Sequence, residues 1–204
     1  MKKPRIKLIA IAGGSGSGKT SLADDLARRL GPHVGRISID DYYLDRSHLS
    51  LRQREKVNFD HPRSIEWELL TEHLEKLKKG KTIETPTYDY GGHVRLDKTR
   101  PIKPSQFVLV DGLWPFRSRA MSLLFDLKVY VRCPMKERLA RRLRRDQADR
   151  GRSARSIEQQ YKAHVLPMHD RFVAPQKNRA DLSVQSPVSR ADMELLVDTI
   201  RWLE

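Results

Sequence analysis

Residues 13–20 read Gly-Gly-Ser-Gly-Ser-Gly-Lys-Thr, and this stretch decides the fold. An apolar run over residues 6–12 precedes it, and Leu22, Leu26 and Leu30 follow at helical spacing. The pattern is therefore G-x-x-x-x-G-K-T between a buried strand and an amphipathic helix, which is the context that a phosphate-binding loop requires. A flexible Gly/Ser linker is the alternative, but linkers are not flanked in this way.

The chemistry of the loop follows from its residue types. Glycines let successive backbone N–H groups turn inward around a polyphosphate, and the N-terminus of the next helix faces the same anion. Lys19 adds a positive charge, and the Thr20 hydroxyl is a ligand for Mg²⁺. The sequence thus predicts binding of a nucleoside triphosphate with Mg²⁺ through Gly13, Gly14, Ser15, Gly16, Ser17, Gly18, Lys19, Thr20 and Ser21.

Length and composition favour one α/β domain over residues 1–204. No apolar run approaches the ~20 residues of a membrane span, and the start Met-Lys-Lys-Pro-Arg leads directly into a strand, so we expect a cytoplasmic protein with no membrane partner. The single cysteine, Cys133, has no second cysteine for an internal disulfide.

The net charge of +14 raises nucleic acid as a possible partner, but the charge is unevenly distributed. Residues 132–155 hold nine arginines and one lysine against three acidic residues, which is half of the net charge. No RNA-binding module and no interleaved aromatic residues accompany these arginines. The segment is therefore predicted to face phosphate groups of a small ligand, and a nucleic-acid partner is not expected.

Two acidic residues follow strands of the predicted sheet. The strand over residues 34–39 ends at Asp40, and the fully apolar strand over residues 107–110 ends at Asp111. Ligands of open α/β sheets bind at the carboxyl ends of strands. Asp111 is accordingly predicted to contact Mg²⁺, directly or through water, with a solvated loop aspartate as the alternative.

The remaining elements are expected to flank a doubly wound, mostly parallel sheet. Ser64 is predicted to cap a helix that ends at Gly80, and Ser189 to cap the closing helix. Residues 82–90, with Pro86, are expected to form an edge strand that pairs with residues 100–103 across a turn at Gly91-Gly92, so that residues 82–103 form a β-hairpin. Further strands are expected at residues 127–131 and 182–184, with helices after Pro134 and over residues 157–172, the latter broken by Pro167.

Residues 135–160 carry the arginines in a helix followed by Arg150-Gly151-Arg152. This arrangement predicts a lid that closes Arg142, Arg145, Arg150 and Arg152 over a transferring phosphoryl group. For Arg138 and Arg144 we expect the alternative, a solvated basic face. The absence of Asn-Lys-x-Asp and Leu-Ser-Gly-Gly-Gln motifs argues against a GTPase and a transporter ATPase, and favours a small-molecule kinase.

At this point the residues resemble the uridine kinase (uridine-cytidine kinase) family, in the same order from residue 6 to about residue 185. The resemblance rests on the phosphate loop together with Asp40-Asp41-Tyr42-Tyr43, Ser47-His48-Leu49-Ser50, Asn58-Phe59-Asp60-His61-Pro62, Tyr88-Asp89-Tyr90 with His93 and Arg95, Arg141 to Asp146, Arg150-Gly151-Arg152 and Gln160-Tyr161.

The resemblance implies a reaction and a set of roles. It implies that Asp40 is the general base for the nucleoside 5′-hydroxyl and touches the Mg²⁺ shell, with a loop N-cap as the alternative for Asp40 and especially for Asp41. From the lid itself we expect Arg145 and Arg152 to act in catalysis, and Arg145 and Arg150 to bind ATP. The resemblance further implies a nucleoside pocket made by Asp40, Tyr43, Phe59, Asp60, Tyr88, Tyr90, His93, Arg142 and Gln160.

Within that implied pocket, Asp60, Arg142 and Gln160 match the sugar site, so ribonucleosides are expected over deoxyribonucleosides. Tyr88, Tyr90 and His93 match the base site; for Tyr90 and His93 ordinary hairpin packing is the alternative. Imidazole can donate to a carbonyl or accept from an amine, so both uridine and cytidine are expected as substrates. The resemblance also implies a homo-oligomer, a tetramer, regulated by pyrimidine triphosphates.

The chain departs from the family pattern at three places. Asp111 stands where the family usually has Glu, Arg63-Ser64-Ile65-Glu66 replaces a small, acidic stretch, and Trp114-Pro115-Phe116 is bulky. The last two flank the expected acceptor pocket, so substrate preference is open to change. The runner-up activity is a kinase for another small hydroxyl compound, such as phosphoribulose or pantothenate, and a more distant alternative is a basic nucleic-acid-binding regulator with an NTPase fold.

Overall fold

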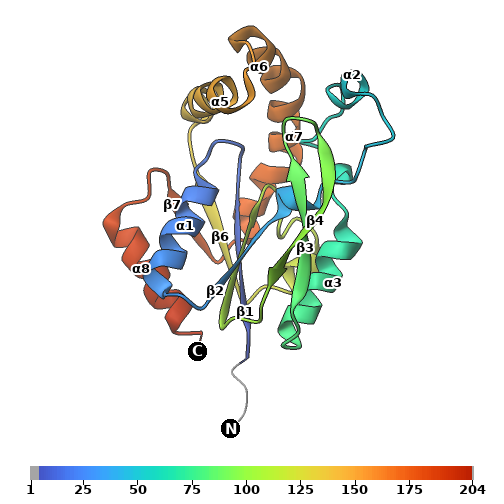
Figure 1. Cartoon of the computed structure of the whole chain (residues 1–204). Coiled ribbons are helices and arrows are strands. Elements are labelled where there is room, and N and C mark those ends of the chain that lie inside the picture. The colour runs from blue at the N-terminus through green and yellow to red at the C-terminus, as the bar shows by residue number, and fades with distance from the viewer. Residues whose placement is uncertain (1–4, 204) are drawn as a thin grey trace.

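The computed structural model describes residues 5–203, without the side chains of Asp149 and Arg150. Its centre is a sheet of five strands in the order β2-β5-β1-β6-β7, with helices on both faces (Figure 1). Every neighbouring pair in this sheet is parallel. The predicted fold class is confirmed. The strands are β1 (Lys7–Gly13), β2 (Val34–Ser38), β5 (Phe107–Gly112), β6 (Leu127–Arg132) and β7 (Leu182–Gln185).

The two central strands bury both of their faces. In β1 and β5 the even-numbered apolar residues pack into one core layer and the odd-numbered ones into the other, because the strands are in register with Ile9 opposite Leu109. Leu70 and Leu74 of α3 cover the first layer, and α1 and α8 cover the second. This explains why β1 and β5 read as continuous apolar runs. The longer helices are α1 (Lys19–Leu30), α3 (Trp67–Lys78), α5 (Met135–Arg150), α6 (Ala154–Gln160) and α8 (Arg190–Arg201).

The shorter helical segments connect these elements. The 3₁₀ turns η1 (Ile39–Tyr42) and η2 (Pro62–Ser64) and the short helices α2 (Leu51–Arg54) and α4 (Arg119–Ser122) lie in the loops that follow the strands. Ser189 caps α8 as predicted, because its hydroxyl accepts a hydrogen bond from the backbone of Asp192 at 3.0 Å.

The predicted cap at Ser64 is wrong. Ser64 is buried in η2, where its hydroxyl donates to the carbonyl of Asn58 at 2.9 Å, and α3 begins only at Trp67. Ile65 belongs to a β-bridge with Tyr43 and not to the helix. The hydroxyl is used to fold the preceding loop, so it is not available to the helix.

The predicted break at Pro167 does not occur. The chain stays helical from α6 onward and includes Pro167 in α7, although proline has no N–H to donate to the preceding turn. Turns of π-helix flank it on both sides, which is a common way to insert an irregularity into a helix. The segments are η3 (Tyr161–Val165), α7 (Leu166–Met168), η4 (His169–Val173) and η5 (Ala174–Arg179).

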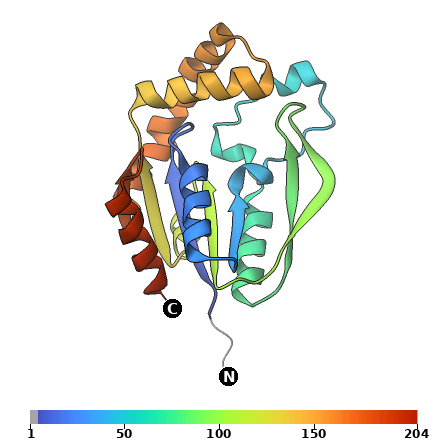
Figure 2. The ribbon, with the colours of Figure 1, turned by 60° about the vertical axis from the view of Figure 1, so that its left-hand side comes forward.

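The hairpin consists of β3 (Ile83–Asp89) and β4 (Val94–Ile102), which pair antiparallel and form a separate sheet. The pairing of β4 starts directly after a turn at Gly91 to His93, so this strand is longer than the expected residues 100–103. Most of β4 is exposed, and it therefore lacks an apolar signal in the sequence. Figure 2 shows α5 lying across the carboxyl ends of the strands, with the hairpin standing beside α3.

Candidate active site

The loop between β1 and α1 surrounds a buried lysine. Gly16 and Gly18 have φ angles of 77° and 90°, which glycine adopts most readily. The Nζ atom of Lys19 donates to the carbonyl of Gly14 at 3.0 Å. Burial lowers the pKa of Lys19, and the carboxylates of Asp40 and Asp111 oppose this shift. The loop therefore holds its ammonium group in one defined position.

Asp111 lies at the end of β5, next to the first turn of α1. Its Oδ2 accepts a hydrogen bond from the Thr20 hydroxyl at 3.0 Å, and its Oδ1 lies 3.3 Å from Nη2 of Arg36. Asp111 is buried. The alternative interpretation, a solvated loop aspartate, is therefore wrong. Arg36 was missed by the sequence reasoning, although an arginine inside the otherwise apolar strand β2 was the available signal.

Asp40 lies in η1, at the carboxyl end of β2. The cap of this turn is Ser38, whose hydroxyl accepts from the backbone N–H of Asp40 at 3.3 Å. The Oδ1 atom of Asp40 is buried and has no hydrogen-bond partner in the part of the chain that the structure describes. Burial raises the pKa of Asp40 to about 6, and the nearby Lys19 ammonium limits the shift. A carboxylate in this environment is suited to accept a proton.

These oxygen atoms fit a hard divalent cation. The Thr20 hydroxyl, the Asp111 carboxylate and the unpartnered Oδ1 of Asp40 are the donor types that Mg²⁺ prefers. In the described part of the chain no three His, Cys, Asp or Glu side chains gather to hold a metal. Mg²⁺ is usually bound by one or two carboxylates together with substrate phosphates, so the donor set suits an ion that arrives with a nucleotide.

Asp41 connects the end of β2 to the hairpin. Its Oδ1 accepts from the Tyr90 hydroxyl at 3.1 Å, and its Oδ2 lies 3.4 Å from Nη2 of Arg100. Burial raises the pKa of Asp41, and the Tyr90 hydrogen bond opposes the shift. Asp41 therefore fixes Tyr90 relative to the phosphate loop.

The predicted base-pocket residues form one aromatic cluster. Tyr43 contacts Phe59 edge to face at a centroid distance of 5.2 Å and contacts Tyr88 at 5.3 Å. Phe59 stacks on His93 at 4.9 Å with an interplanar angle of 14°. Tyr90 joins the cluster through Tyr88 at 5.5 Å. Residues from three separate stretches of sequence thus meet in one cluster, and two of them, Tyr43 and Tyr90, line the same cavity as Asp40.

Arg142 of α5 joins the phosphate loop to the predicted sugar site. Its Nη1 donates to the Ser15 hydroxyl at 3.1 Å and lies 3.9 Å from the Asp60 carboxylate. Its Nη2 donates to Oε1 of Gln160 at 2.9 Å, and its Nε lies 3.3 Å from Asp146. Burial raises the pKa of Asp60, while Arg142 opposes the shift. The structure thus brings together Asp60, Arg142 and Gln160, the three residues that the resemblance assigns to the sugar site.

The other predicted lid arginines lie nearby. Nε of Arg145 contacts Asp146 at 2.9 Å, and Nη1 of Arg152 donates to Gln160 at 2.6 Å. The side chain of Arg150 lies outside the part of the chain that the structure describes. Gly151 ends α5 with a φ of 60°, so the chain turns sharply between Arg145 and Arg152.

The prediction that Arg138 is solvated is wrong. Arg138 is 4% exposed and packs against Gly14 and Gly16 of the phosphate loop, whereas Arg144 is exposed as expected. The helical spacing of α5 places Arg138 and Arg142 one turn apart on the same face, and this face is turned toward the loop. The sequence pattern of this helix did not indicate that the glycines of the loop would pack against the face that carries Arg138.

One cavity of about 840 Å³ is lined by the phosphate loop together with Asp40 and Asp111. Its lining includes Tyr43 and Tyr90 and also the connection between β7 and α8, which was not predicted as part of the site. The aromatic and sugar-site residues Phe59, Asp60, Tyr88, His93 and Gln160 adjoin it through Tyr43 and Arg142. The predicted residues that line the cavity directly are Ser15, Gly16, Gly18, Lys19, Thr20, Ser21, Asp40, Tyr43, Tyr90, Asp111, Arg142 and Arg145.

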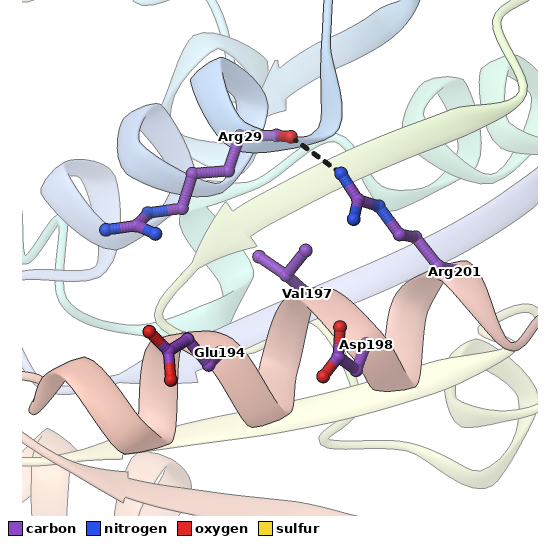
Figure 3. Close-up of a pocket in the computed structure, with 5 residues that line it drawn as sticks. All are labelled: Arg29, Glu194, Val197, Asp198 and Arg201. Atoms are coloured by element: carbon purple, nitrogen blue, oxygen red, sulfur yellow. Dashed lines mark hydrogen bonds between the residues drawn. The ribbon is translucent and has the colours of Figure 1, made fainter.

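A second cavity, of about 360 Å³, lies between α1 and α8 (Figure 3). Arg201 donates from Nη2 to the carbonyl of Arg29 at 3.2 Å, which satisfies a free carbonyl at the end of α1. None of the predicted catalytic residues lines this cavity. Its polar groups are explained by helix packing.

The departures from the family pattern affect the site in different ways. Trp114 is fully buried in the core and does not line the main cavity. Glu66 forms an ion pair with Arg95, whose Nη2 donates to the carbonyl of Tyr43 at 2.7 Å. Glu66 therefore supports the aromatic cluster from outside, and Trp114 supports the sheet.

Across residues 5–203, none of the helices has the length and apolar character needed to cross a bilayer.

Comparison with known proteins places these features in context. Residues 8–193 match the model of the Phosphoribulokinase / Uridine kinase family. The chain is 42% identical over 178 residues to the uridine kinase of Staphylococcus aureus strain JH9, covering 87% of this chain and 86% of that protein.

Solved structures share the fold. The phosphoribulokinase from Rhodobacter spheroides superposes with a TM-score of 0.66 at 19% identity, covering 90% of this chain and 71% of that one. The D-glycerate 3-kinase from Cryptococcus neoformans superposes with a TM-score of 0.62 at 18% identity, covering 82% and 79%.

Proposed function

Because the chain belongs to the phosphoribulokinase/uridine kinase family, we propose that this kinase transfers the γ-phosphoryl group of ATP to the 5′-hydroxyl of uridine or cytidine. The products are ADP and the nucleoside 5′-monophosphate, as in pyrimidine salvage. The observation that carries the proposal is the single cavity in which Lys19 and Asp40 lie with Tyr43 and Tyr90. Such a cavity allows a polyphosphate and an aromatic base to approach the same carboxylate.

Asp40 is the proposed general base. The proton of the 5′-hydroxyl passes to its carboxylate, the hydroxyl oxygen attacks the γ-phosphorus in line, and ADP leaves with the former bridging oxygen. The burial of Asp40 and its unpartnered Oδ1 suit this role, because the free oxygen can accept a hydrogen bond from a substrate.

The donor end of the cavity binds ATP in this proposal. Lys19 and the loop hold the β- and γ-phosphates, and Arg145, Arg150 and Arg152 approach them when the lid closes. Thr20 and Asp111, with Asp40 nearby, would hold Mg²⁺, which neutralises the charge that develops on the phosphoryl oxygens. The connection between β7 and α8 also lines the cavity, and in this proposal it contacts the nucleoside of ATP.

The acceptor end selects a pyrimidine ribonucleoside. The rings of Tyr43, Phe59 and Tyr88 offer faces and edges for a base, and His93 can hydrogen-bond a carbonyl or an amine at its edge. Asp60 and Arg142 are buried polar groups that ribose hydroxyls can satisfy, with Gln160 beside them. A sugar without the 2′-hydroxyl would leave them without that partner, so ribonucleosides are preferred.

The test is ADP release with ATP and Mg²⁺, run in parallel on uridine, cytidine, 2′-deoxyuridine, ribulose 5-phosphate and pantothenate. We expect turnover of uridine or cytidine, and Asp40→Asn should lower it by about 10²- to 10⁴-fold while the variant still binds ADP and uridine. Turnover of only a non-nucleoside would refute the proposed acceptor. An Asp40→Asn enzyme with near wild-type turnover would refute the general base.

A further inference from the structure

Arg138 is a buried cation in contact with the phosphate loop. Arg138 is 4% exposed. A Cβ atom added to Gly16 would lie only 2.5 Å from the backbone carbonyl oxygen of Arg138. The Cδ and Cζ atoms of Arg138 would lie 3.0 Å from a Cβ on Gly14. The backbone at Gly14 has an ordinary φ, so the need for glycine there comes from the guanidinium and not from a left-handed conformation.

The guanidinium of Arg138 lacks a counter-ion in the described residues. Its Nε and Nη1 are buried without hydrogen-bond partners, and no carboxylate whose side chain the structure describes forms an ion pair with it. Arg142, one turn further along α5, differs because Asp60 and Asp146 lie within ion-pair distance. A buried charge without a partner is costly, so a partner is expected to arrive with a ligand.

The position of Arg138 indicates which ligand. Arg138 packs against Gly14 and Gly16, and the carbonyl of Gly14 accepts the hydrogen bond from Lys19, which lines the main cavity. An anion held by this loop would therefore lie close to both cations.

We propose that Arg138 is a positioning residue that supports the phosphate loop from behind, and that its counter-ion is the polyphosphate of the bound nucleotide. The inference rests on the proposed function only in taking ATP and ADP as ligands. It adds a positive charge, packed against the loop, to those of the predicted lid arginines. The nucleotide thereby compensates a charge that is uncompensated in the free enzyme.

The test compares Arg138→Met, which removes the charge, with Arg138→Lys, which keeps it. Arg144→Met is the matched control, because Arg144 is exposed on the same helix. Calorimetry measures binding of ADP with Mg²⁺, of inorganic tripolyphosphate and of uridine, each at two salt concentrations. We expect Arg138→Met to weaken both phosphate ligands about tenfold, to reduce their salt dependence and to leave uridine binding unchanged. Arg138→Lys should retain most of the affinity, and Arg144→Met should match wild type.

Thermal unfolding gives a readout that simple loss of packing would not reproduce. Without ligand, Arg138→Met should unfold at or above the wild-type temperature, because a buried unpaired charge is gone. Addition of ADP should raise the unfolding temperature of Arg138→Met less than that of wild type, because the variant binds ADP more weakly. If Arg138→Met fails to fold, the double variant Gly14→Ala/Arg138→Lys is compared with the two single variants. Their effects on ADP binding should be less than additive, because both act through one contact.

The outcomes separate this inference from the proposed function. Wild-type affinity of Arg138→Met for ADP, or an equal loss for ADP and uridine, would overturn the role of Arg138. Fully additive effects of Gly14→Ala and Arg138→Lys would do the same. If the wild-type protein binds ADP but does not phosphorylate uridine, the proposed function fails while the assignment of Arg138 is still tested by ADP and tripolyphosphate.

Discussion

The Thr20 hydroxyl donates to the Asp111 carboxylate at 3.0 Å, although 91 residues separate them in sequence. The two side chains meet because β1 and β5 are parallel neighbours, with Ala12 opposite Gly112, so their carboxyl ends lie at the same edge of the sheet. Arg36 holds the other oxygen of Asp111. The hydroxyl and the carboxylate thus form an oriented oxygen pair beside the phosphate loop.

This oxygen pair predicts a defined effect on Mg²⁺ dependence. Asp111→Asn should raise the Mg²⁺ concentration for half-maximal activity several-fold, because an amide oxygen carries no charge to attract the cation. The measurement is ADP formation against Mg²⁺ at fixed ATP. Asp24→Asn is the matched control, since the exposed Asp24 also pairs with Arg36 but lies outside the cavity. An unchanged Mg²⁺ curve for Asp111→Asn would exclude Asp111 from the metal site.

The buried Oδ1 atom of Asp40 predicts a pH-dependent stability. Burial raises its pKa from 3.8 to about 6 in the folded chain. Such a group contributes stability below pH 3.8 that is lost as pH rises through 6, because the ionised form is disfavoured in the fold. Asp40→Asn should therefore be more stable than wild type above pH 7, by up to about 3 kcal/mol, and should match it near pH 4.

Denaturant unfolding without nucleotide and with a metal chelator measures this difference. Asp97→Asn, on the exposed part of β4, gives the background for changing a surface carboxyl. A constant difference between Asp40→Asn and wild type at all pH values would contradict the prediction.

The contact between Asp60 and Arg142 predicts how the enzyme discriminates sugars. Asp60→Ala should lower kcat/KM for uridine much more than for 2′-deoxyuridine, because the wild-type preference depends on buried polar groups that the 2′-hydroxyl satisfies. The ratio of the two kcat/KM values, about 10² or more for wild type, should fall toward one. Asp41→Asn, which disturbs Tyr90 instead, should lower both values alike. A preserved ratio in Asp60→Ala would place the sugar elsewhere.

Trp114 predicts a change in stability without a change in specificity. Trp114 is fully buried with Phe116 in the core layer beneath the cavity, so Trp114→Ala should cost about 3–5 kcal/mol in the free energy of unfolding. Trp114→Phe should cost less. Urea unfolding measures the loss, and the ratio of kcat/KM for uridine and cytidine should stay at its wild-type value. A changed ratio in Trp114→Phe would show that this residue shapes the acceptor pocket after all.

The sequence by itself determined the phosphate loop, the class of sheet and the two acids that follow strands. Each of these depends on local chemistry: glycines at fixed spacing, apolar runs buried on both faces, and carboxylates at strand ends. The resemblance to a family added the base and sugar residues, and the structure brings these into an aromatic cluster that includes Tyr43 and a polar group around Arg142.

Only the tertiary structure decided which polar groups are buried and what each one meets. Ser64 and Pro167 carry strong local signals, yet Ser64 bonds to Asn58 and Pro167 lies inside a continuous helix. Arg138 and Arg144 look alike in sequence, but the first packs against two glycines of the loop and the second faces solvent. Burial depends on the docking of α5 across the sheet, and a local pattern does not specify which face of a basic helix another segment will cover.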